Sequence, residues 1–138
     1  MSDFQLVGEM HKKFGFNVSD SSSKLPTTEM LVFRLRFLHE ELGELIKAIG
    51  DRDTVEIADA LADIVYVAYG TAHYCNLPMD EIFAEVHRSN MQKELATKEH
   101  PSKRGQGDND LVKPLWWTKP DISGVIAKHN EGTDDKTV

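Results

Sequence analysis

The chain has 138 residues, with 16 Lys and Arg against 23 Asp and Glu and a net charge of −7. This length predicts one domain with a core of its own. The acidic balance argues against a general nucleic-acid binder, because such proteins hold the phosphate backbone with a basic surface. The single cysteine, Cys75, cannot form an intrachain disulfide, and no apolar run reaches the roughly 18 residues of a membrane span. With no leader-like segment either, we expect a soluble cytoplasmic protein that does not enter a membrane.

Two helices are predicted in the first third of the chain. The first spans residues 3–15 and is stopped by Gly15; its expected packing side consists of Phe4, Val7, Met10, His11 and Phe14. Residues 16–27 are mostly turn formers and predict a loop. The second helix starts at Thr27 or Thr28 and ends at Gly50; its apolar stripe at three-and-four spacing consists of Leu31, Leu35, Leu38, Leu42, Leu45 and Ile49.

Two further helices follow. In "DRDTVE", Asp53 precedes Glu56 by three residues, the spacing of a capping box, which predicts a third helix from there to about Cys75. A fourth helix is expected from about Pro78 to Lys98, ending near Pro101; its predicted buried residues are Ile82, Phe83, Val86 and Met91. Four helices with short connections predict an all-α four-helix bundle.

The C-terminal part has a different pattern. From Lys103 onward the sequence predicts an irregular segment, although Trp116 and Trp117 are too apolar to stay free and are expected to pack as a lid or on a partner subunit. Residues 129–138 have no aromatic or aliphatic anchor before Val138. We therefore expect a domain over residues 1–128 and a mobile tail over residues 129–138.

The third predicted helix contains "EIADALADIVYVAYGTA", an apolar or small run that nevertheless carries three acids. Glu56, Asp59 and Asp63 are spaced i, i+3 and i+7, so they share an arc of roughly 60° on one face. Like charges this close raise each other's pKa, and burying them unpaired costs several kcal/mol each. A positive partner is therefore expected at this face.

The second predicted helix offers a matching set of acids in "HEELGELIKA", namely Glu40, Glu41 and Glu44. Antiparallel packing through the turn near Gly50 would bring the two acidic faces together. Six carboxylates, with few His, Cys or basic residues nearby, predict a hard-oxygen site for Mg²⁺ or Mn²⁺ rather than Zn²⁺.

Some of these acids also fit structural roles. Glu56 fits the capping residue that answers Asp53, and Glu40 lies opposite the leucine stripe as a solvated charge would. Asp59 and Asp63 are the hardest to explain structurally, because they lie one turn apart inside the apolar run. Both interpretations of Glu56 and of Glu40 are open at this point.

The segments "EELGEL", "DALADIVYVAYGTA" and "EVHRSNMQK" resemble the MazG-like all-α nucleoside triphosphate pyrophosphohydrolases, the superfamily that also holds phosphoribosyl-ATP pyrophosphohydrolase and the dimeric dUTPases. The resemblance covers about residues 5–122, including "MHKKFG" and a late "VKPLWWTKPDI" that is similar to one bacterial and phage branch. It implies a homodimer or homotetramer. It also implies that Glu41 and Glu44 are the E-x-x-E pair that binds divalent cations.

The family's second ligand pair, E-x-x-D, matches in two registers. In the first register, Glu56 and Asp59 match the E-x-x-D pattern itself. In the second register, Asp63 matches the Asp that precedes the "IVY" run. The second register places Ala60 where the family has Glu, so Asp59 would have to take over the missing ligand. By the same resemblance, Asn90 completes a metal or phosphate shell, and Lys93 and Lys113 contact the phosphates. For the base, we expect the first helix and the segment after it to supply stacking or hydrogen bonds from His11, Phe14 and Phe16, with Trp116 closing over the nucleotide.

The implied reaction is hydrolysis of a nucleoside triphosphate between the α and β phosphates, with Glu40 or Glu41 as general base. The phage branch called MazZ acts on dGTP, so dGTP or GTP is the leading substrate; dUTP, dCTP and phosphoribosyl-ATP are alternatives.

A non-enzymatic helical interaction module is a competing class, but it does not explain the acids. Di-iron proteins require E-x-x-H pairs, which this sequence lacks.

Overall fold

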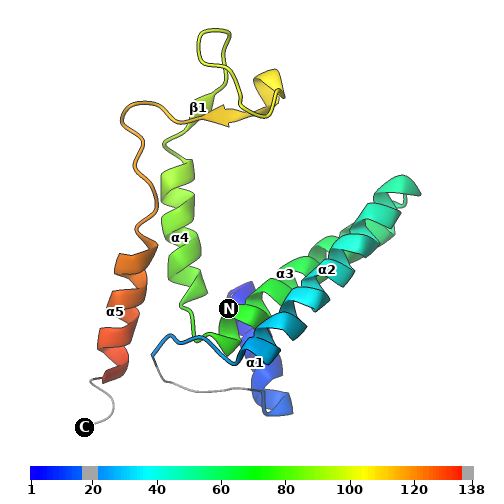
Figure 1. Cartoon of the computed structure of the whole chain (residues 1–138), viewed down its shortest axis with the longest axis vertical. Coiled ribbons are helices and arrows are strands. Elements are labelled where there is room, and N and C mark those ends of the chain that lie inside the picture. The colour runs from blue at the N-terminus through cyan, green and yellow to red at the C-terminus, as the bar shows by residue number, and fades with distance from the viewer. Residues whose placement is uncertain (17–21, 135–138) are drawn as a thin grey trace. The chain divides into compact units, whose positions relative to one another are not determined.

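The computed structural model describes residues 1–16 and 22–134 (Figure 1). Over these ranges it contains five α-helices, a short 3-10 helix and one two-stranded sheet, which confirms the all-α class. Two compact units are present, Met1–Met79 with Ile126–Val138 and Asp80–Val125, and each is described by itself. Over the described ranges, every helix is too short or too polar to cross a membrane.

Helix α1 (Asp3–Phe14) has well-defined ends. The Ser2 hydroxyl accepts the Gln5 amide and the Gln5 side chain accepts the Ser2 amide, a reciprocal capping box that satisfies two otherwise unpaired N–H groups. Gly15 ends the helix with a φ of 69°, a left-handed conformation that favours glycine. The predicted first helix is confirmed.

Helices α2 (Thr28–Gly50) and α3 (Thr54–Tyr74) form an antiparallel pair (Figure 1). Thr27 caps α2 through Met30, and the Asp53 carboxylate accepts the amides of Val55 and Glu56 at the start of α3. Both predicted helices are confirmed within one or two residues. The short turn between α2 and α3 makes the two helices antiparallel. The predicted convergence of their acidic faces depends on this arrangement.

The packing side of the first unit is built from small residues. Ala48 on α2 and Ala60 on α3 are buried, which permits close approach of the two helices, while Val7 of α1 packs on α3. The expectation that the α2 stripe is buried is wrong for Leu35, Leu42 and Ile49, which are exposed, and the other three members are only half-buried. Within one chain, α3 packs on only one side of α2, so part of the apolar stripe of α2 lies outside the contact between the two helices.

Helix α4 (Met79–Asn90) is shorter than predicted, since the expected helix to Lys98 ends at Asn90. The Ser89 carbonyl accepts both the Gln92 amide and the Trp117 indole N–H, so it does not bond the Lys93 amide as a continuing helix requires. Along α4, Ile82 is buried as expected, but Phe83 and Met91 are exposed, contrary to the expectation.

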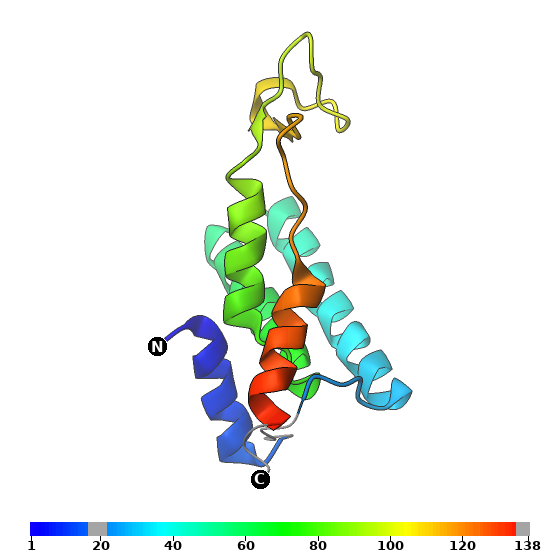
Figure 2. The ribbon, with the colours of Figure 1, turned by 90° about the vertical axis from the view of Figure 1, so that its left-hand side faces the viewer.

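The chain after α4 is more regular than predicted. Strands β1 (Glu94–Leu95) and β2 (Leu111–Val112) pair antiparallel, with the 3-10 helix η1 (Gly107–Asn109) between them. The segment that follows β2 runs alongside α4 (Figure 2), where the Ser89 hydroxyl donates to the Thr118 carbonyl at 2.8 Å and the Asp121 amide donates to Glu85 at 2.9 Å.

Helix α5 (Ile122–Asp134) corrects the expectation of an irregular C-terminal segment. Its glycines and β-branched residues disfavour a helix, but the Asp121 carboxylate accepts the Gly124 amide at its start. A side chain at Gly124 would collide with that carboxylate. Residues 129–134 of the expected mobile tail are therefore helical; residues 135–138, like 17–21 of the expected loop, lie outside the described ranges.

Candidate active site

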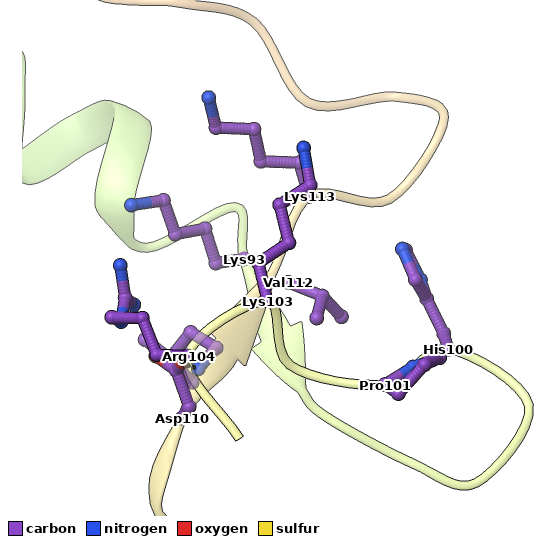
Figure 3. Close-up of a pocket in the computed structure, with 9 residues that line it drawn as sticks. Lys93, His100, Pro101, Lys103, Arg104, Asp110, Val112 and Lys113 are labelled. Atoms are coloured by element: carbon purple, nitrogen blue, oxygen red, sulfur yellow. Dashed lines mark hydrogen bonds and ion pairs between the residues drawn. The ribbon is translucent and has the colours of Figure 1, made fainter. Parts of the chain in front are cut away.

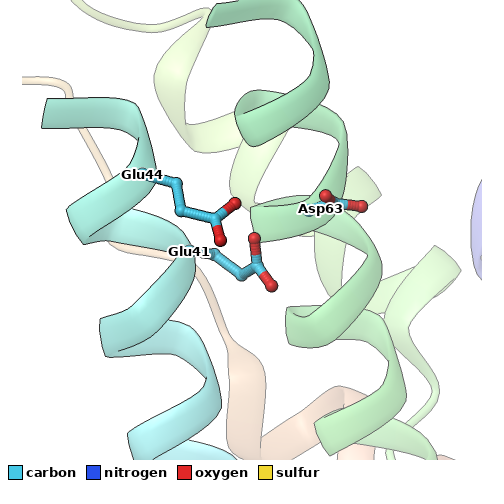
Figure 4. A group of neighbouring side chains, drawn as sticks. All are labelled: Glu41, Glu44 and Asp63. Carbon is cyan, nitrogen blue, oxygen red and sulfur yellow. The ribbon is translucent and has the colours of Figure 1, made fainter. Parts of the chain in front are cut away.

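Three carboxylates from two helices converge in the first unit. Glu41 and Glu44 extend from α2 toward α3, which carries Asp63 (Figure 4). One oxygen of each lies within 4.8 Å of the other two. Helical periodicity places the two glutamates one turn apart on the same face, and the antiparallel pairing brings the aspartate opposite them.

Glu41 is the buried member of this cluster, with Glu44 exposed and Asp63 half-buried. Its Oε2 atom is buried and has no hydrogen-bond partner. Burial raises the pKa of Glu41, and the charges of Glu44, Asp63 and Glu40 raise it further. The cluster therefore holds excess negative charge that no ion pair among the described side chains compensates.

The chemistry of this cluster fits a hard divalent cation. All three donors are carboxylates, and one buried oxygen, Oε2 of Glu41, has no hydrogen-bond partner. Oxygen-only ligands suit Mg²⁺ or Mn²⁺, and such an ion would reverse the repulsion that raises the pKa of Glu41. The residues present therefore fit the metal predicted from the sequence.

The other three predicted acids lie outside this triad among the described side chains. Glu40 neighbours Glu41 on α2 but is exposed. Asp59 is exposed one turn before Asp63 on α3. The Asp53 carboxylate accepts the Glu56 amide. The Asp51 carboxylate is the main cause of the raised pKa of Lys47, and the charge of the Glu56 carboxylate contributes to it. The Asp53 amide donates to the Ala48 carbonyl rather than to the Glu56 side chain, so the expected capping box is incomplete, and the ligand role of Glu56 stays a prediction.

A second polar group lies between α1 and α3. His11 is 2 % exposed and its Nδ1 atom has no hydrogen-bond partner. Arg34 of α2 is also buried, donating to the Val67 carbonyl at 2.9 Å and to the Thr71 hydroxyl at 3.2 Å. Gly70 leaves the room for both, because a Cβ there would lie 2.7 Å from the guanidinium and 3.3 Å from His11.

Burial lowers the pKa of His11 to about 4, and the charges of His73 and Arg34 contribute to the same direction. The unfolded chain, with a histidine pKa of 6.5, binds the proton first as the pH falls, so the fold loses stability between pH 6.5 and pH 4. We expect thermal denaturation in EDTA to show a loss of several degrees in Tm from pH 7 to pH 5, much of it absent in His11→Gln.

The matched control for this pH dependence is His39→Gln, which removes an exposed histidine of α2. It should leave the slope of Tm against pH unchanged. Equal slopes in wild-type protein and His11→Gln would contradict the assignment of a neutral buried His11.

The predicted substrate-binding residues fall into both units. In the first, the exposed Phe14 ring stacks on Phe16 with centroids 6.0 Å apart, and Phe16 meets His11 edge-on at 5.6 Å. In the second, Asn90 is the last residue of α4, so Lys93 lies beyond the helix, although the predicted fourth helix included both residues on one helical face. Lys93 instead lies beside Lys113 in one cavity of this unit.

The tryptophan pair divides between two environments. Trp116 is 64 % exposed, whereas Trp117 donates its indole N–H to the Ser89 carbonyl and lies under the Lys113 ammonium, 4.1 Å from the ring centre. Trp117 therefore packs within the second unit of its own chain, and the expected role of the pair as a lid or a partner contact stays a prediction. Trp116 stays a candidate for stacking.

Sequence reasoning missed several polar residues with defined surroundings. Arg34 interrupts the stripe of the second helix between Leu31 and Leu38, a position where a charge needs an explanation. The run "KEHPSKR" supplies His100, Lys103 and Arg104 to the cavity that holds Lys93 and Lys113, and that local density of basic residues was the available signal.

Comparison with known proteins agrees with the geometry. The profile of the phosphoribosyl-ATP pyrophosphohydrolase family matches residues 7–90, which include all three clustered carboxylates. This chain belongs to that family. An uncharacterized protein of Acanthamoeba polyphaga mimivirus is 32 % identical over 82 residues, an alignment that covers 57 % of this chain and 33 % of the viral protein. The family is named after a pyrophosphohydrolase, a class of enzyme that typically depends on divalent metals.

Proposed function

We propose that the chain hydrolyses a nucleoside triphosphate between the α and β phosphates, giving a nucleoside monophosphate and pyrophosphate. The observation that carries the proposal is the convergence of Glu41, Glu44 and Asp63 between α2 and α3 in a chain of this family. The resemblance to nucleoside triphosphate hydrolases of the MazG-like superfamily narrows the substrate class. A cytoplasmic location suits such a substrate.

The proposed site contains metal ligands and a general base. The three carboxylates would hold Mg²⁺ or Mn²⁺, which would neutralise phosphate charge and lower the pKa of a water molecule. Glu41 or its neighbour Glu40 would accept the water proton as general base. Asp59, one turn from Asp63, and Glu56 remain proposed additional ligands.

We propose dGTP or GTP as the substrate, supported by the likeness to the phage branch of the superfamily. His11, neutral at pH 7 with a pKa of about 4, is the proposed hydrogen-bonding partner of the base, although its unpaired Nδ1 is buried in the single chain, so the contact requires a local opening at α1. Phe14 and Trp116 are exposed aromatic rings suited to stacking. Asn90, Lys93 and Lys113 are proposed phosphate contacts.

A nucleotide screen tests the activity. The purified chain with Mg²⁺ or Mn²⁺ is incubated with the ribo- and deoxynucleoside triphosphates and phosphoribosyl-ATP, and released pyrophosphate is measured. We expect hydrolysis of dGTP or GTP above the others, and none in EDTA. Preference for dUTP, dCTP or phosphoribosyl-ATP would overturn the substrate, and no cleavage of any compound with either metal would overturn the function.

We also propose that the chain works as a homodimer or homotetramer. Large apolar side chains remain exposed along α2 and α3 of a single chain, namely Leu35, Leu42, Ile46, Ile49, Val55, Leu61 and Val65. A patch of this kind on a helical pair is typical of a protein interface.

Sedimentation velocity at micromolar concentration should give a dimer or tetramer. Ile46→Glu should shift the distribution toward monomer, because a charge in a buried apolar interface lacks a partner. Leu25→Glu, equally exposed but outside the helical pair, is the control. A monomeric wild-type chain would contradict the proposal.

A further inference from the structure

A basic cavity of about 330 Å³ lies within the second unit, in the segment that contains the two strands (Figure 3). Nine residues line it: Lys93, His100, Pro101, Lys103, Arg104, Asp110, Leu111, Val112 and Lys113. Four of them are cations at neutral pH and one is an acid. The other described acids of this segment, Glu94 and Glu99, do not line the cavity. All nine residues follow the stretch that the family profile matches.

The hairpin explains why these cations meet. Glu94 pairs with Val112 in the antiparallel register, so Lys93 and Lys113, the residues just outside the strands, lie opposite each other. The connection between the strands brings Lys103 and Arg104 to the same cavity. In Figure 3 the three lysine side chains extend to the same side of the ribbon.

The single acid of the cavity is already engaged. Asp110 accepts hydrogen bonds from the Arg104 guanidinium, the Ser102 hydroxyl and the Leu111 amide, which lower its pKa to about 2. It therefore neutralises Arg104 and fixes the loop.

The three lysines keep their charge uncompensated. Among the described side chains, Lys93, Lys103 and Lys113 form no ion pair; Lys113 contacts only the Trp117 ring face. Three ammonium groups around one small cavity repel one another. An anion bound between them lowers this electrostatic repulsion.

The size and charge of the cavity define the anion. Its volume is at the lower end of the range for small-molecule sites, roughly 300–1,000 Å³. Three cations within that volume match a compact polyanion such as a phosphate chain better than a single carboxylate. A nucleic acid is disfavoured, because the chain as a whole carries a charge of −7.

We propose that this cavity binds the phosphate chain of a small molecule, with Lys93, Lys103 and Lys113 as the main contacts. This deepens the proposed function, which already makes Lys93 and Lys113 phosphate contacts, by adding Lys103 and a shared cavity; its connection to catalysis rests on that function. The phosphate chain has two candidate sources, the nucleotide undergoing hydrolysis or a separate ligand such as free pyrophosphate.

Pyrophosphate binding in EDTA tests the site without metal, because the carboxylate cluster alone repels the anion. By calorimetric titration at low salt, wild-type protein should bind pyrophosphate and Lys103→Gln should bind it about tenfold or more weakly, since one charge-assisted contact is lost. Lys98→Gln removes a lysine of the same segment that does not line the cavity, and it should bind like wild type. Circular dichroism checks that both variants keep their helices.

Two results would overturn the proposal: no pyrophosphate binding by wild-type protein, or equal affinities of Lys103→Gln and Lys98→Gln. Turnover of the same variants with Mn²⁺ then identifies the source of the phosphate chain. A raised KM in Lys103→Gln alone assigns the cavity to the hydrolysed nucleotide, whereas an unchanged KM assigns it to a separate ligand. Lysine-dependent pyrophosphate binding in a chain that cleaves no nucleotide would leave the site standing and reject the proposed function.

Discussion

Asp63→Asn is expected to abolish pyrophosphate release while leaving the fold intact. The substitution keeps the shape of the side chain but removes one of the three charges that converge within 4.8 Å. Since a neutral amide is a weaker ligand for a hard cation, the loss of turnover should exceed about a hundredfold. Pyrophosphate release and circular dichroism of the purified variant measure the two parts of this expectation.

The matched control is Glu56→Gln, an acid on the same helix outside the cluster. If Glu56 acts only at the helix start, this variant loses a little stability and keeps full activity. If it loses activity as Asp63→Asn does, Glu56 is a ligand and the alternative register of the second pair applies. Wild-type rates in Asp63→Asn would contradict the metal assignment.

Glu41→Gln is expected to change stability and activity in opposite directions. Without metal, the buried Glu41 carboxylate is repelled by Glu44, Asp63 and Glu40, so the neutral amide should raise the Tm in EDTA. Turnover should fall by at least about a hundredfold, because the chain loses a ligand or its general base. The rise in Tm that Mn²⁺ gives to wild-type protein should shrink in this variant.

Glu40→Gln separates the two possible roles. If Glu40 is the base, this variant keeps the stabilisation by Mn²⁺ and loses turnover; if Glu41 is the base, Glu40→Gln stays active. A Glu41→Gln protein that is less stable than wild type in EDTA would contradict the account of an uncompensated buried charge.

The helices of the first unit were predictable because local signals define them. Thr27 and Asp53 cap α2 and α3 as their sequence positions indicated, and Gly15 ends α1. Helix α4 was overextended because its end depends on a non-local contact, the bond from the Trp117 indole to the Ser89 carbonyl. Helix α5 was missed because its composition disfavours a helix.

The candidate site was predictable in part for the same reason. Periodicity places Glu41 and Glu44 on one face, but it does not fix which acid of α3 lies opposite them. That choice depends on how far the two helices slide along each other, and the turn before Asp53 brings Asp63 into the cluster rather than Glu56. The pairing of Lys93 with Lys113 depends likewise on strand register.

The identity of the products tests the central claim most directly. ³¹P NMR of the best substrate incubated with the chain and Mn²⁺ distinguishes the two bonds that can break. We predict equal amounts of pyrophosphate and nucleoside monophosphate, as cleavage between the α and β phosphates requires. A nucleoside diphosphate with orthophosphate would contradict the account.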